Sequence, residues 1–117
     1  MANCLEKKRG SKMKNEQLPT IQTYGDYSTS NYGVHCMMVH LPRSKANKHG
    51  LTIYYSYETC IAFRGYIDAE NCGLFVIKNY WGSTTGKHLN AIDGGNKEKR
   101  LDEKTFEKLF KKALRNA

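Results

Sequence analysis

The chain has 117 residues, a hydrophobic fraction of 39% and a formal net charge of +8. This length predicts one domain with a modest core, and the composition excludes a mainly disordered chain. No apolar run approaches the roughly 20 residues of a membrane-spanning helix, so we expect a soluble, cytoplasmic protein with no membrane partner.

The positive charge lies at the two ends of the chain. Residues 1–18 carry a net charge of +3, residues 19–96 a net charge of +1, and residues 97–117 a net charge of +4. The segment 1–18 lacks hydrophobic periodicity and is predicted to be a basic flexible tail. Its first 12 residues precede a second methionine, Met13, and are open to interpretation as an extension without a structural role. Residues 19–117 are predicted to form a single α+β domain.

A polar segment, 23–33, contains three spaced tyrosines, Tyr24, Tyr27 and Tyr32. Gly, Asp, Ser and Asn fill the positions between them, and each of these residues favours turns. One interpretation is a structured loop whose rings cover one end of a sheet. The other is an aromatic binding surface, since tyrosine is enriched at interface hot spots.

Four segments have the apolar or alternating pattern that is typical of strands. Parallel pairing would need crossover connections of roughly a dozen residues or more, usually helical. The loop 42–50 and a turn predicted over 66–72 are too short for that, so an antiparallel sheet is expected. The predicted strands are 34–41, 51–57, 59–64 and 73–81.

The segment 82–95 has the glycines and lysine of a phosphate-binding loop but not its spacing. Such a loop has four residues between its glycines and a hydroxyl residue after the lysine. Here only three residues separate Gly82 from Gly86, and His88 follows Lys87. The parallel sheet that presents these loops is also not expected, so a nucleotide site is excluded.

The same segment predicts a short helix over 84–93. Ser83, Thr84 or Thr85 can accept a hydrogen bond from a free backbone N–H as N-cap, and Gly94–Gly95 can end the helix in the left-handed region. Lys87, near the helix start, suits contact with one phosphate. We interpret His88 as a structural hydrogen-bonding residue, because the sequence ties no nucleophile or carboxylate to it.

The segment 102–115 predicts an amphipathic helix capped by Asp102. We expect the sheet, of four or five strands, to be covered on one face by this helix and the short one. The opposite side of the C-terminal helix is either a solvated face or a patch for phosphates or an acidic protein. The apolar face comprises Phe106, Leu109, Phe110, Ala113 and Leu114, and the basic side Lys104, Lys108, Lys111 and Arg115.

The cysteines predict neither a metal site nor a disulfide framework. Cys4, Cys36, Cys60 and Cys72 show none of the close ligand pairs that zinc sites have. Cys36 and Cys60 lie in strand-like runs, where a buried free thiol is ordinary. No cofactor is expected.

Three segments together resemble a known family. They are YGDYSTSNYG (24–33), YYSYETCIAF (54–63) and NYWGSTTGKHLNAIDGG (79–95). They resemble a small domain of uncharacterised proteins carried by phages, mobile elements and some archaea. The resemblance spans roughly residues 23–114 and brings no established activity or catalytic residues. It implies a phage setting, in which small proteins often inhibit host machinery, as anti-CRISPR proteins do.

From this resemblance we expect a small non-enzymatic binding protein that inhibits a host defence nuclease. The expected partner is a host protein or ribonucleoprotein, a Cas effector above all. Because the chain is basic, mimicry of DNA is not expected. The alternative is a nucleic-acid-binding module that contacts DNA or RNA phosphates. Trp81 is either an anchor for the partner or a core residue at the sheet edge. The candidate partner-binding residues are Tyr24, Tyr27, Tyr32, Trp81, Thr84, Thr85, Lys87 and His88, and the candidate basic patch is Lys78, Lys104, Lys108, Lys111 and Arg115.

Overall fold

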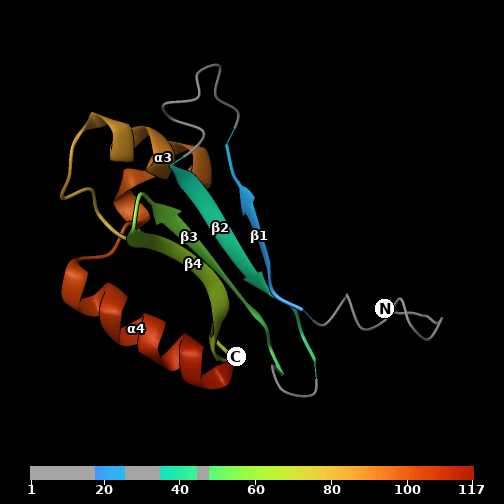
Figure 1. Ribbon diagram of the computed structural model, residues 1–117. Helices are drawn as coiled ribbons and strands as arrows, with labels where there is room; N and C mark the ends of the chain where they lie inside the picture. The colour runs from blue at the N-terminus through green and yellow to red at the C-terminus, as the bar shows by residue number, and fades with distance from the viewer. Residues whose placement is uncertain (1–17, 26–34, 45–47) are drawn as a thin grey trace.

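A five-stranded antiparallel sheet and two α-helices form the described part of the chain, residues 18–25, 35–44 and 48–117 of the computed structural model (Figure 1). Each strand pairs with the next, in the order β1-β2-β3-β4-β5. The predicted α+β fold is confirmed. The elements are β1 (Thr20–Thr23), β2 (Cys36–Leu41), β3 (Leu51–Ser56), β4 (Thr59–Asp68), β5 (Asn71–Val76), α3 (Ser83–Asp93), the 3-10 helix η1 (Lys97–Lys99) and α4 (Glu103–Asn116).

The hairpin between β4 and β5 is tighter than the sequence predicts. A turn lies within the predicted 66–72, but its predicted length is wrong, because β4 continues to Asp68 and β5 begins at Asn71. The Asp68 carboxylate accepts hydrogen bonds from the backbone N–H groups of Glu70 and Asn71, both at 2.9 Å. This side-chain turn needs few residues. The buried Ile67 is thereby left free to extend the strand.

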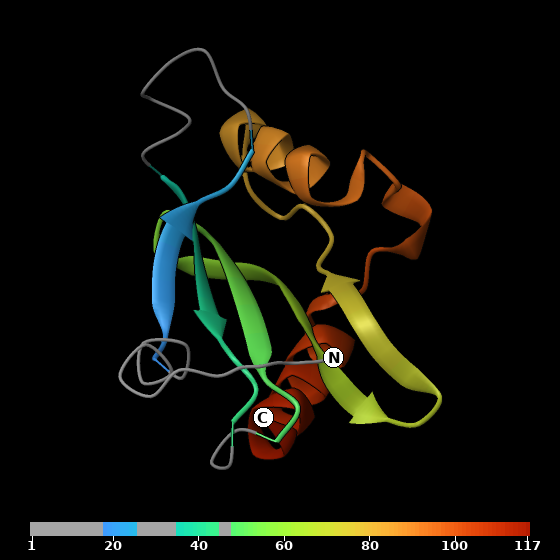
Figure 2. The same ribbon diagram turned by 90° about the vertical axis from the view of Figure 1, so that its right-hand side faces the viewer.

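β4 is the longest strand and bends strongly along its length (Figure 2). Its pairing shifts register opposite Tyr54 and Tyr55 of β3, and again between Tyr66 and Asp68 opposite β5. Such bulges bend a strand and increase its twist. The second half of β4, with β5, therefore turns away from β1 and β2.

Phe63 of β4 is the centre of the core beneath α4. Its side chain has no exposed surface. Its ring centroid lies 5.1 Å from that of Phe75, 5.4 Å from that of Phe106 and 5.2 Å from that of Phe110. Gly65 lets the helix come close, since a Cβ there would lie only 3.2 Å from the Cβ of Ala113. The apolar stripe predicted for 102–115 thus packs on β4 through Phe106, Phe110 and Ala113, but its last member, Leu114, is 46% exposed and does not belong to the core.

The two helices do not share a face of the sheet, so the expectation that both cover one face is wrong. Ile53 pairs with Phe63 on the α4 side. Ser56, three residues further along β3, therefore points to the other side. Its hydroxyl contacts α3, lying 3.0 Å from Thr85 Oγ1. α3 lies across one end of the sheet (Figure 1). The local sequence predicts the helix but not its face, because that depends on the path of 77–82.

The helices end where the sequence predicts, and one of the predicted caps differs. Asp102 caps α4 as predicted, its side chain accepting from the Thr105 N–H at 2.8 Å. Gly94 ends α3 in the left-handed region, with φ of 67°. The expected hydroxyl N-cap of α3 is wrong, because Gly82 occupies the N-cap position without a side-chain bond. The hydroxyl of Thr85 is instead used in the contact with Ser56.

Phe63→Ala tests the core beneath α4. We expect a loss of about 3–5 kcal/mol in the free energy of unfolding, because the substitution leaves a cavity that three other rings line. Chemical denaturation followed by circular dichroism measures it. Leu114→Ala is the control, since Leu114 is 46% exposed and should cost well under about 1 kcal/mol. Equal losses in the two variants would contradict this account of the core.

Candidate functional site

The chain leaves β5 beside the start of α4. Ile77 forms a parallel bridge with Leu101. The Leu101 N–H donates to the Val76 carbonyl and the Lys78 N–H donates to the Leu101 carbonyl, both at 2.8 Å. These bonds hold the segment that follows β5 against the residue that precedes the Asp102 cap.

Two exposed aromatic side chains, Tyr80 and Trp81, follow this bridge; we refer to them as the aromatic corner. Their exposed fractions are 54% and 43%, and their ring centroids lie 6.0 Å apart in an edge-to-face arrangement. The Trp81 N–H donates to Asn79 Oδ1 at 2.8 Å, and Tyr80 Oη accepts from the Glu103 N–H at 3.2 Å. Hydrogen bonds therefore restrain the Tyr80 hydroxyl and the Trp81 backbone, and both rings stay outside the core.

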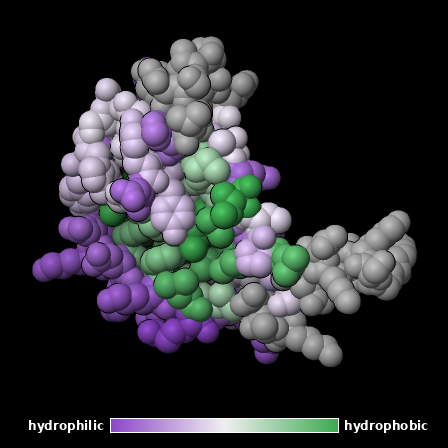
Figure 3. Space-filling view, in the orientation of Figure 1, coloured by the Kyte–Doolittle hydropathy of each residue, from purple (hydrophilic) through white to green (hydrophobic). Residues whose placement is uncertain are grey.

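The basic ridge runs along the outer side of α4. Its four members are all exposed, and Figure 3 shows hydrophilic side chains gathered at the lower left, where α4 lies. A shallow groove of about 380 Å³ follows the ridge, with Lys112 and a single carboxylate, that of Glu107, also lining it. The members of the ridge are Lys104, Lys108, Lys111 and Arg115.

Asp102 connects the aromatic corner to the ridge. Hydrogen bonds from the backbone N–H and side chain of Thr105 lower the pKa of the Asp102 carboxyl, and the charges of Lys78 and Lys104 lower it further. The backbone geometry agrees, since the Lys78 N–H donates at 2.8 Å to the carbonyl of Leu101, the residue that precedes Asp102. The corner, Lys78 and the ridge therefore form one surface around the start of α4.

A pocket of about 360 Å³ lies beside this surface, and Lys78 and Lys97 are two of its cationic lining residues. The third cation, Arg100, is already paired: its Nε lies 2.8 Å from Asp93 Oδ2 and its Nη2 lies 3.0 Å from Asn90 Oδ1. The Arg100 pair ties η1 to the end of α3. Arg100 is therefore a structural cation, and Lys78 and Lys97 are the two exposed lysines that line the pocket.

Three of the candidate partner-binding residues are buried. Tyr24 is 8% exposed, and its hydroxyl donates to the Tyr55 carbonyl at 2.8 Å. His88 has no exposed surface, and its Nδ1 lies 2.7 Å from the Ser56 hydroxyl. Thr85, also 8% exposed, contacts the same hydroxyl. Burial removes Tyr24, Thr85 and His88 from the candidate interface, and the geometry agrees with the structural interpretation of His88.

The remaining candidates divide between exposed and undescribed positions. Lys87 is exposed and Thr84 half-buried on α3. Tyr27 and Tyr32 lie outside the described residues. Tyr80 was missed by sequence reasoning, although it adjoins Trp81 just after an apolar run. The alternative of a core tryptophan is wrong, because Trp81 keeps nearly half of its surface exposed.

The thiols in the described residues show no sign of an activated nucleophile. Burial raises the pKa of the Cys60 thiol to about 12 and also raises that of Cys36. A raised pKa keeps a thiol protonated and unreactive. Cys72 is exposed. Within 18–25, 35–44 and 48–117, no three His, Cys, Asp or Glu side chains gather as a metal ion would require.

The chain belongs to a family of unknown function, DUF8033, whose model matches residues 20–108. The match covers the sheet, α3 and the first part of α4. Comparisons with curated proteins and with solved structures found no match. Neither helix of the described residues has the length and apolar composition needed to cross a membrane.

Asp93→Asn tests the tie between α3 and η1. The Arg100 and Asp93 side chains are only 4% and 9% exposed, so removing one charge leaves the other buried and unpaired. We expect a loss of about 3 kcal/mol in the free energy of unfolding at neutral pH. Glu98→Gln, at an exposed position of η1, is the control and should have little effect.

The effect of Asp93→Asn on the free energy of unfolding is also expected to depend on pH. Burial alone would raise the pKa of Asp93, but hydrogen bonds from Arg100 and the Gly95 N–H, with the charge of Arg100, lower it overall. Because the pKa of Asp93 is lower in the folded protein, its ionised carboxylate stabilises the fold. This stabilisation is complete above the ordinary Asp pKa of about 3.9 and is lost as the pH falls through the lowered pKa. Urea denaturation should therefore show the difference between wild type and variant shrinking below about pH 4. A difference independent of pH would contradict the role of the ion pair.

Proposed function

We propose that this protein is a non-enzymatic, single-stranded nucleic-acid-binding module. The ridge and Lys78 hold the phosphates, and the aromatic corner stacks on unpaired bases. The observation that carries the proposal is the junction at Asp102, where Lys78 and Lys104 join Tyr80 and Trp81 to the basic side of α4.

Electrostatics supports the phosphate part of this proposal. The groove along α4 is lined by five cations and one carboxylate. A helix face that is only solvated and held by surface ion pairs would carry alternating positive and negative side chains. An excess of cations on one side of a helix attracts a polyanion and releases its counterions on binding. The +8 charge of the chain adds a long-range attraction in the same direction.

The exposed aromatics favour a single strand over a duplex. Stacking needs a base whose face is free, and duplex bases are already stacked on one another. Base–aromatic stacking contributes about 1–3 kcal/mol per base and tolerates any sequence. Hydrogen bonds hold the Tyr80 hydroxyl and the Trp81 backbone near the start of α4, beside the cations that would bind the neighbouring phosphates. The surface thus combines the two elements that such proteins use.

A protein partner is the second candidate, favoured by an apolar band on the sheet. Ile21 pairs with Val39 on the same face as the α4 core, yet Ile21 is 67% exposed. Met37, Val39 and Leu41 of β2 are half-buried on that face. Figure 3 shows this hydrophobic area over the strands beside α4. Exposed apolar patches of this kind often mark protein contacts.

Inhibition of a host defence nuclease, with a Cas effector in the host cytoplasm as target, stays a prediction that rests on the resemblance to phage and archaeal proteins. A ribonucleoprotein would offer a strand to the ridge and a protein surface to the apolar band. The absence of enzymatic activity likewise stays a prediction.

Lys108→Gln tests the phosphate contacts. We expect wild type to bind a labelled single strand, with log K falling linearly as log salt rises. The variant should bind more weakly and reduce that slope by about 0.7–1. Fluorescence anisotropy between about 50 and 200 mM salt covers the range in which such contacts appear. Lys99→Gln removes one charge from exposed η1 and is the control.

Trp81→Ala tests the stacking contact. We expect it to lower affinity for the strand by about 1–3 kcal/mol without changing the salt slope, because stacking carries no charge. Tyr57→Ala, which removes a 51% exposed ring from the turn between β3 and β4, should leave affinity unchanged. Melting temperatures confirm that both variants fold.

Absence of strand binding at about 50 mM salt, where phosphate contacts are strongest, would overturn the nucleic-acid proposal. The apolar band would then be the surface to pursue. If wild type and Trp81→Ala bind the strand equally strongly, the ridge stays part of the proposed interface and the aromatic corner does not.

A further inference from the structure

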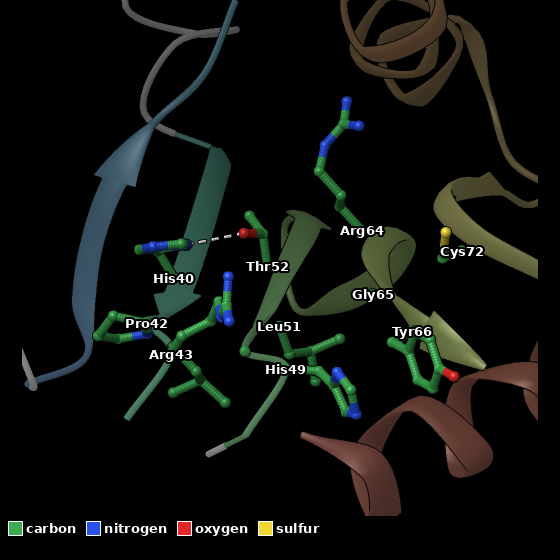
Figure 4. A pocket seen from close by; sticks show the side chains of 12 residues that line it. His40, Pro42, Arg43, His49, Leu51, Thr52, Arg64, Gly65, Tyr66 and Cys72 are labelled. Carbon is green, nitrogen blue, oxygen red and sulfur yellow. Dashed lines mark hydrogen bonds between the residues drawn. The ribbon is translucent and has the colours of Figure 1, made fainter. Parts of the chain in front are cut away.

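A second concave surface lies away from the basic ridge, around the first residues of β3. It encloses about 590 Å³ (Figure 4), a volume within the usual range of small-molecule sites. It is lined by residues of four strands, β2 to β5, and of the loop between β2 and β3. Polar and cationic side chains lie there beside the apolar Leu41, Pro42 and Leu51, and the described lining residues include no carboxylate. The residues on which the inference rests are His40, Arg43, His49, Thr52, Arg64 and Tyr66.

A polar row crosses three neighbouring strands in this pocket. His40 of β2 pairs with Thr52 of β3, and Thr52 pairs with Arg64 of β4. Paired residues point to the same side, so the three side chains lie on the face opposite Phe63. His40 Nδ1 lies 2.8 Å from Thr52 Oγ1, the contact dashed in Figure 4. That bond orients the ring and leaves Nε2 for a ligand.

Gly50 positions Arg43, and any other residue at position 50 would be strained. Gly50 has φ of 73°, and a Cβ there would lie 2.9 Å from the Leu41 carbonyl oxygen and 3.3 Å from Arg43 Cγ. The stem of Arg43 therefore packs directly on the Gly50 backbone. In Figure 4 the Arg43 side chain points toward the middle of the pocket, whereas Arg64 extends from β4 toward α3.

Neither arginine is neutralised within the described residues, where the ion pair of the structure is that of Arg100 with Asp93. Arg43 and Arg64 are both exposed and line a pocket whose described lining residues include no carboxylate. A guanidinium presents paired N–H donors that match the oxygens of a phosphate. Arg64 is an exposed residue, so rotation of its side chain can bring it to a ligand that Arg43 holds.

A flat wall closes the other side of the pocket. The His49 and Tyr66 rings are stacked, with centroids 4.0 Å apart and planes 12° apart. The His49 N–H donates to the Ala117 carbonyl at 3.3 Å, and Asn116 Nδ2 donates to the Tyr66 carbonyl at 3.1 Å. The end of α4 thus holds both residues, and the rigid pair offers a planar surface to a planar ligand.

We propose that this pocket binds a phosphate monoester carried on a planar ring system, that is, a mononucleotide. Arg43 and His40 Nε2 receive the phosphate, and Thr52 orients the His40 ring through its hydrogen bond to Nδ1. Arg64 closes on the phosphate, and the His49–Tyr66 pair lies against the ring system. This site is separate from the ridge and does not depend on the proposed function.

Titration with adenosine 5′-monophosphate, followed by amide NMR shifts of the full chain, tests the site. We expect saturable shifts at His40, Thr52 and Arg64. Arg43→Gln should weaken binding by about tenfold or more, the effect of losing one charge-assisted contact. Arg43→Lys should weaken it less, because it keeps the charge and loses the paired donors. Adenosine alone and inorganic phosphate alone should each bind more weakly than the nucleotide.

Lys108→Gln separates this site from the ridge and should bind the nucleotide as wild type does. Conversely, Arg43→Gln should keep the affinity of wild type for a single strand. Three results would overturn the proposal. The amide shifts could be confined to α4 and the aromatic corner, they could fail to saturate, or Arg43→Gln could bind the nucleotide with unchanged affinity. Because Arg43 is exposed, the variant is expected to fold, and its amide spectrum verifies this directly.

Discussion

The backbone bridge between Ile77 and Leu101 determines where every candidate binding residue on the α4 side lies. Between these two residues the chain leaves the sheet, forms α3 and η1, and returns to the same place. Two hydrogen bonds of 2.8 Å join the segment that follows β5 to Leu101, where the chain returns. The closure places Lys78, Tyr80 and Trp81 beside the first turn of α4. Without it, α4 would still be amphipathic, but its basic side would have no aromatic neighbours.

The sequence predicts those features whose causes are local. The helix 102–115 follows from one apolar stripe and from a carboxylate that caps it, and Asp102 accepts the expected bond. Its basic ridge follows from the same periodicity, because residues three and four apart share a side of a helix. The strands follow from alternation and β-branched residues. The extension of β4 to Asp68 was missed because the Asp68 turn occupies fewer residues than the polar composition of 66–72 indicates.

Features that depend on distant pairing could not be predicted in this way. The burial of Tyr24, Thr85 and His88 follows from their meeting with β3, and nothing within their own segments encodes that meeting. The polar row of His40, Thr52 and Arg64 exists only because β2, β3 and β4 pair in one register. The exposure of Trp81 depends on Asn79, whose side chain turns the chain outward after β5.

The hydrogen bonds of the aromatic corner also affect the entropy of association. An aromatic side chain on a loose loop must be ordered when a ligand arrives, and the lost conformational freedom reduces the net affinity. Here Asn79 and the first turn of α4 restrain the backbone at Trp81 and the hydroxyl of Tyr80 before any ligand is present. The ridge lysines are long, exposed chains that still have this freedom to lose. The Tyr80 ring and the backbone that carries Trp81 are therefore preorganised, and each of these two residues should contribute more to net binding than a lysine of the ridge does.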